Sequence, residues 1–282
     1  MPVRNEDWVL GLSARVALQW CDRLVVLLHE CEDRSPELAY DLSAEYPDRL
    51  IVTHMGGEWK EMEHRQWMLE LARKASATHI AMIDADEVLT ANLTEEPLYG
   101  VKPIRSLVET LAPGQMLELP GYNLRGSLDR YHSNGIWGNR WFSVAFKDTP
   151  EAYWAGDKFH SRNPAAVKWQ NWRPIKQGEG GILHLWGASE RRLRAKHALY
   201  KVVERTRFET KTVAAIDDLY NLAIKPRETW SFEVTPLEWW KHQVPRDCIA
   251  PHAEPWQEAE VRRLVAEHGK EKFQGLDLFG VA

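Results

Sequence analysis

The first 90 residues alternate short apolar runs with amphipathic stretches, and this alternation restricts the possible folds more than any other feature. The first apolar stretch is at Val3. Three apolar runs of strand length come after it, at Leu24–Leu28, Leu50–Val52 and His79–Ile83. Between these runs, apolar residues recur at helical spacing and predict three helices. The first begins at about Glu6, the second runs from Ser35–Pro36 to near Tyr46, and the third runs from Glu58 to Lys74. Buried strands that alternate with helices predict a parallel, right-handed βαβ sheet, so the expected fold class is α/β.

Periodicity weakens after residue 100. Leu117–Leu119 predicts a short strand, and residues 120–186 carry Gly, Asn and Trp in a pattern typical of irregular structure and short strands. Ser189 predicts the cap of a helix that runs to about Thr210, and Pro255 opens a final helix.

Composition places the chain among ordinary globular proteins, with 44% hydrophobic and 27% charged residues. Its longest strongly apolar run, Leu24–Leu28, is far shorter than the roughly 20 residues of a membrane-spanning helix. Charged residues occupy the start of the chain, where a signal peptide would be apolar, so we expect a cytoplasmic protein. The three cysteines are widely spaced, which predicts reduced thiols rather than disulfides or a thiolate zinc site.

Charge is distributed unevenly along the chain. Residues 1–100 hold 9 Lys and Arg against 19 Asp and Glu, whereas residues 101–282 hold 27 against 22. An acidic first third is not typical of a nucleic-acid surface. The basic remainder could meet an anionic ligand or acceptor.

The sharpest local feature is the acidic turn Asp84-Ala85-Asp86-Glu87, which follows the apolar run at His79–Ile83. Ligands of open α/β sheets bind at the carboxyl ends of strands, which is where these carboxylates are expected. Crowded carboxylates need a cation, and hard oxygen ligands suit Mg²⁺ or Mn²⁺. The alternative interpretation is a solvated acidic turn without a function.

Three segments together resemble nucleotide-sugar glycosyltransferases of the GT-A fold, in particular the family 2-like group. They are Val3–Glu6, then Glu63–Trp67 with Thr78–Glu87, and finally Ile182–Leu185 with the basic stretch Ser189–Tyr200. The resemblance implies a Rossmann-like, mostly parallel sheet flanked by helices, with an irregular Trp-rich acceptor half and C-terminal helices. It divides the chain into a nucleotide-sugar-binding half (1–115), an acceptor-binding and catalytic half of the same domain (116–210) and a helical extension (211–282).

The resemblance also assigns roles to single residues. Asp86 and His184 would ligate Mn²⁺ or Mg²⁺, with Asp84 at the ribose or in the outer shell of the metal. His184 could instead be a buried histidine that packs beside Trp186. Base, ribose and diphosphate of the nucleotide sugar, most simply a UDP-sugar, would be bound by Arg4, Asn5, Glu6, His29, Arg65, Asp84, Ala85, Arg192 and Lys196.

Inverting sugar transfer needs a carboxylate that accepts the proton of the acceptor hydroxyl. Among the carboxylates between the acidic turn and His184, Asp157 is the first candidate because a glycine and a tryptophan precede it closely. Asp129 is the second candidate. A retaining enzyme would need no such base.

Tryptophan is unusually frequent, at 14 residues, and its rings can cover the apolar faces of sugars. Most of these rings are expected in the core, and Trp154 is the one expected to line the acceptor site. The charged helix from Ser189 is either a solvated face, a diphosphate clamp, or a strip for a polyanionic acceptor.

These features predict a metal-dependent glycosyltransferase (hexosyltransferase type) that inverts by single displacement. Its acceptor would be a glycan or another hydroxylated molecule, with a hydroxymethylated DNA base as a nucleic-acid alternative. Two other functions remain open. One is a metal-dependent nucleotidyltransferase or phosphohydrolase, although Gly11 alone makes no phosphate loop. The other is a carbohydrate-binding protein without catalysis.

Overall fold

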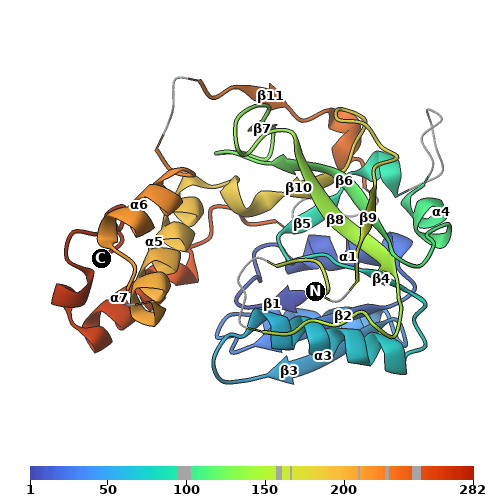
Figure 1. Ribbon diagram of the computed structural model, residues 1–282, viewed down its shortest axis with the longest axis horizontal. Helices are drawn as coiled ribbons and strands as arrows, with labels where there is room; N and C mark the ends of the chain where they lie inside the picture. Colours follow the sequence, from blue (N-terminus) through green and yellow to red (C-terminus); the bar gives the residue numbers. More distant parts are fainter. Residues whose placement is uncertain (95–102, 157–160, 166, 209, 226–228, 243–248) are drawn as a thin grey trace. The chain divides into compact units, whose positions relative to one another are not determined.

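The computed structural model describes residues 1–94, 103–156, 161–165, 167–208, 210–225, 229–242 and 249–282. It has a mixed α/β fold with two compact units (Figure 1). The first unit comprises residues 1–122, 139–184 and 236–249, and the second comprises residues 123–138, 185–235 and 250–282. Each unit is therefore built from three separate stretches, whereas the sequence predicted three consecutive parts.

A three-stranded parallel sheet opens the first unit, with strands in the order β1 (Pro2–Val3), β2 (Leu24–His29) and β3 (Leu50–Met55). Helices α1 (Leu10–Trp20), α2 (Ser35–Glu45) and α3 (Glu61–Lys74) connect the strands and lead on from β3. The alternation predicted from the sequence is confirmed here. Helix α1 begins four residues later than predicted, because the Glu6 carbonyl first accepts the amides of Val9 and Leu10 in a turn.

The second sheet of this unit has the strand order β4 (His79–Ala81), β8 (Arg140–Lys147), β6 (Gln115–Asn123), β10 (Ile182–His184) and β5 (Glu87–Leu89), and β9 (Gln170–Trp172) pairs in parallel with β6. Strand β4 pairs antiparallel with β8 and lies in this second sheet, so among the described residues the predicted parallel sheet is confirmed only for β1, β2 and β3. Helix α4 (Ile104–Glu109) and two short 3₁₀ helices, at Ala91–Leu93 and Leu237–Trp240, complete the unit.

Strand β8 lies in the region that was predicted to hold irregular structure and short strands. Its central residues, Ser143 to Phe146, are buried, and β4 and β6 pair with its two edges. Apolar side chains of α3, β4, β6 and β8 form a core cluster that includes Met62, Leu69, Ile80, Met116 and Phe146. Trp154 belongs to the same cluster and is only 6% exposed, so most of its ring is used for packing.

The second unit contains β7 (Arg130–His132), which pairs with β11 (Phe232–Val234), and the helices α5 (Glu190–Arg207), α6 (Val213–Asn221) and α7 (Trp256–His268). Short 3₁₀ helices lie at Leu185–Gly187 and Lys270–Phe273. The predicted cap is confirmed, since the Ser189 hydroxyl accepts the amide of Arg192. Buried Lys201 on α5 forms a 2.8 Å ion pair with Asp217 on α6.

Two further observations bear on the class of protein. Across the described residues, no helix combines the length and the low polarity that a bilayer crossing requires. Cys21 and Cys31 are free thiols, and Cys248 lies outside the described residues.

Candidate functional site

The acidic turn connects β4 to β5 in the first unit and brings its three carboxylates into different surroundings. The Asp84 side chain is 31% exposed, Asp86 is 7% exposed and Glu87 is 1% exposed. Two hydrogen bonds close the turn: the Asp84 amide donates to the Glu87 carboxylate, and the Glu87 amide donates to the Asp84 carbonyl. The turn is therefore an ordered part of the fold and not a solvated loop.

Asp86 and His184 meet although 98 residues separate them in the sequence (184 − 86). Strand β10 pairs antiparallel with β5, with His184 opposite Glu87, and this register sets His184 beside Asp86. His184 Nε2 lies 3.6 Å from Asp86 Oδ1, and the Phe142 ring packs edge-on against the imidazole at 5.5 Å. The predicted pairing of these two residues is thus present in the geometry. His184 lies on β10 in the first unit, whereas Trp186, its alternative packing partner, belongs to the second unit.

Asp84 faces arginines. Arg65 on α3 places Nη2 3.4 Å from Asp84 Oδ1 and also pairs with Glu61 at 3.0 Å. Burial acts to raise the pKa of Asp84, but the positive charges of Arg65 and Arg162 outweigh it and hold the pKa below its ordinary value. Asp84 is therefore an ionised carboxylate whose charge is balanced by the protein.

Glu87 forms a two-pronged ion pair with Arg162, a residue that no sequence pattern had selected. Arg162 Nη1 lies 2.5 Å from Glu87 Oε1, and its other terminal nitrogen contacts the second carboxylate oxygen and the Met82 carbonyl. Burial acts to lower the pKa of Arg162, and the Glu87 carboxylate outweighs it and raises the pKa. Arg162 thereby ties the acidic turn to the segment that precedes it.

A second group of predicted residues lies where β1 and β2 end. The Asn5 side-chain oxygen accepts the amides of Glu32 and Asp33 at 2.7 and 3.3 Å. The Glu6 amide donates to the Ser35 hydroxyl, and the Asp7 amide donates to the Asp33 carboxylate. These bonds join the loops that follow the two strands into one polar edge. Arg4 lies between β1 and this loop, and its charge adds to the effect of burial in lowering the pKa of His29.

His29 ends β2 in a cluster of aromatic rings. Its ring centre lies 5.0 Å from Trp59 and 4.7 Å from His64, and its side chain is fully buried. Burial lowers the pKa of His29 and lowers that of His64 to about 4, so both imidazoles are neutral at pH 7. The backbone of Gly57 lies close enough to the His29 ring to offset part of this lowering of the pKa.

The remaining predicted residues fall into three groups. Ala85 is buried within the acidic turn. Asp157 lies outside the described residues. Asp129, Arg192 and Lys196 belong to the second unit, where Asp129 is exposed and Arg192 is buried with a guanidinium bond to the Ala253 carbonyl. Their roles toward a sugar or a diphosphate stay predictions.

The spacing of Asp86 and His184 fits a shared divalent ion. Two ligands that are each about 2.1 Å from one ion lie about 3.0 Å apart at a right angle and about 4.2 Å apart on opposite sides. The observed 3.6 Å falls between these limits and exceeds a hydrogen bond. Within the described ranges, no three His, Cys, Asp or Glu side chains are grouped so that they could hold a metal without other ligands.

No protein-family model matches the chain, and no curated protein is significantly similar to it in sequence.

Proposed function

We propose that this chain is a metal-dependent glycosyltransferase with a GT-A type site for a nucleotide-diphosphate sugar. The observation that carries the proposal is the approach of Asp86 to His184, a carboxylate and an imidazole at a spacing that one divalent ion can bridge. Magnesium and manganese bound by one or two protein groups take their other ligands from substrate phosphates and water. A site with two protein ligands therefore fits a substrate that carries a diphosphate.

The surroundings support an anionic substrate. The carboxylates of Asp84 and Glu87 form ion pairs with Arg65 and Arg162, and Asp86 is the carboxylate of the turn that lies beside His184. When bound, the ion would neutralise the diphosphate of the leaving nucleotide. In this proposal, Arg65 and Asp84 orient the ribose and the diphosphate, and the polar edge at Asn5 and Glu6 holds the base and the ribose.

We propose that the sugar is transferred by a single displacement. The acceptor oxygen bonds to the anomeric carbon, the bond from that carbon to the diphosphate oxygen breaks, and its electron pair leaves with the nucleoside diphosphate. The hydroxyl proton passes to a carboxylate, for which Asp157 is the first proposal and Asp129 the second. A UDP-sugar is the proposed donor, and a glycan hydroxyl the proposed acceptor.

The test is release of nucleoside diphosphate from a panel of nucleotide sugars, with Mn²⁺ or with EDTA. We expect release with at least one donor, loss of release in EDTA, and loss of release in Asp86→Asn. Asp41→Asn is the matched control, because Asp41 is an exposed carboxylate on α2. Metal-independent release, or full activity of Asp86→Asn, would overturn the proposal.

A further inference from the structure

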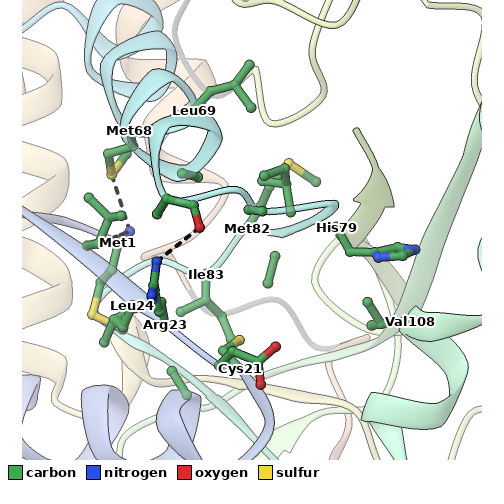
Figure 2. Close-up of a pocket in the computed structure, with 18 of the residues that line it drawn as sticks. Met1, Cys21, Arg23, Leu24, Met68, Leu69, His79, Met82, Ile83 and Val108 are labelled. Carbon is green, nitrogen blue, oxygen red and sulfur yellow. Dashed lines mark hydrogen bonds between the residues drawn. The ribbon is translucent and has the colours of Figure 1, made fainter. Parts of the chain in front are cut away.

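The first unit contains a cavity of about 580 Å³ between its two sheets (Figure 2). Protein interiors have few voids larger than one water molecule, so a partly open space of this size beside two sheets has room for an additional segment. Met1 and Leu24 line one side of the cavity and His79 and Val108 line the other, as Figure 2 shows. Leu69 and Ala72 of α3 line it as well, and so do residues at the end of α1.

The cavity separates two strands that each end a sheet. Strand β1 is the outer strand of the parallel sheet, and β4 is the outer strand of the other sheet. Residues Leu24 and Val25 of β2 extend past the point where β1 begins, because Pro2 is paired with Leu27 and Val3 with Leu28. In the described part of the chain, Leu24 and Val25 therefore have a strand partner only in β3. Exposed strand edges of this kind are templates for another strand.

Met1 lines the cavity, and its backbone is hydrogen-bonded as in a strand residue. Its amino nitrogen donates to the Val25 carbonyl at 2.9 Å, and its carbonyl accepts the Leu27 amide at 3.0 Å. These are the two bonds by which a residue of a parallel strand pairs with its neighbour, so Met1 continues β1 backwards opposite Val26. Polypeptide attached to Met1 would run from there into the cavity.

We propose that this cavity is the seat of an additional parallel strand segment, formed by polypeptide that precedes Met1 and lying between β2 and β4. In the register of β1 with β2, the two residues before Met1 would lie opposite Val25 and Leu24, at about 3.3 Å per residue. The segment would turn the two sheets into one, with the order β3-β2-β1-β4-β8-β6-β10-β5. Because helices α1 and α3 cover its two faces, we expect its residues to be apolar on both faces.

The charge of the amino group agrees with this geometry. Met1 is 8% exposed, and burial lowers the pKa of its ammonium group to about 5. Asp84 and Cys21 oppose this shift, and the positive charges of Arg65 and Arg162 add to it. The site thus favours a neutral nitrogen, and a peptide N–H at this position is neutral and makes the same bond to Val25. This inference is independent of the proposed function.

The test uses the full chain and two extended versions. One carries Lys-Ile-Val-Ile before Met1, and the control carries Gly-Ser-Gly-Ser. Both convert the ammonium to a peptide N–H, so the difference between them measures the filling of the cavity by apolar side chains. We expect the apolar extension to raise Tm by about 5 °C or more above the Gly-Ser control. Equal Tm values for the two extended versions would overturn the proposal.

A second measurement does not depend on the designed residues. Mass spectrometry of the N-terminal peptide of the protein, isolated from the cells that make it, should show residues joined to Met1 with apolar side chains among them. A native N-terminus at Met1 or Pro2 would also overturn the proposal.

Discussion

Glu87 and Arg162 form a buried, two-pronged ion pair that joins the start of β5 to a segment 75 residues further along the chain (162 − 87). Glu87 is 1% exposed, and the side chain of Arg162 is 18% exposed. The same guanidinium donates to the carbonyl of Met82, just before the acidic turn. This pair therefore holds both ends of the turn that carries Asp84 and Asp86.

Replacing Arg162 should destabilise the protein strongly. In Arg162→Met, the Glu87 carboxylate would remain buried without its partner, and such losses cost about 3–5 kcal/mol. Urea unfolding at pH 7 measures the change, and Arg263→Met on the exposed face of α7 is the control. Adding Glu87→Gln to Arg162→Met should recover part of the loss, because it removes the unpaired charge. A loss below about 1 kcal/mol in Arg162→Met would contradict the structural role.

The ion pair between Arg65 and Asp84 predicts a pH dependence. The pKa of Asp84 is lowered in the fold, so this pair contributes stability above the ordinary pKa of 3.8 and loses it as the pH falls through the folded value. Arg65→Met removes the larger of the two favourable charges, so the variant should lose less stability than the unmodified protein between pH 5 and pH 3. Arg65→Lys, which keeps the charge, should resemble the unmodified protein. Parallel stability curves for all three proteins in urea would contradict this prediction.

Buried His197 on α5 predicts a second pH effect, in the second unit. Burial lowers its pKa to about 3, while the unfolded chain has an ordinary value of 6.5. The unfolded state therefore binds a proton first, and the stability should fall as the pH drops from 6.5 toward 3, by about 1.4 kcal/mol per pH unit at most. His197→Phe should flatten this slope, and His268→Gln, at an exposed position, should not. Unfolding in urea at pH 7 and pH 5 compares the three proteins.

The sequence predicted the parts of the fold that depend on local pattern. The apolar run at Leu24–Leu28 and the proline in the first turn of α2 predicted β2 and α2 correctly, because burial and capping act over a few residues. The pairing of β4 with β8 was not predicted. The residues at the ends of β8 are polar and its paired residues lie more than 60 positions from β4, so no local period signals the pairing.

The candidate site follows the same division. The acidic turn was visible because three carboxylates follow one apolar run, and His184 was selected by resemblance to a known family. Arg162 was not predicted, because a single arginine in a region without periodicity does not stand out in the sequence. Its role depends on the ion pair with Glu87, which only the fold brings about. Trp154 was expected at the acceptor site, but it packs mainly in the core, where its ring nitrogen donates to the Arg162 carbonyl at 3.2 Å.

Binding of Mn²⁺ is the most direct test of the central proposal, that Asp86 and His184 hold a divalent ion for a nucleotide diphosphate. Electron paramagnetic resonance of free Mn²⁺ can be recorded with and without UDP for the unmodified protein, Asp86→Asn, His184→Gln and the control Asp41→Asn. We predict one UDP-dependent Mn²⁺ site in the unmodified protein and the control, and its loss in the two site variants. Equal Mn²⁺ binding by all four proteins, or none by the unmodified protein with UDP, would contradict the account.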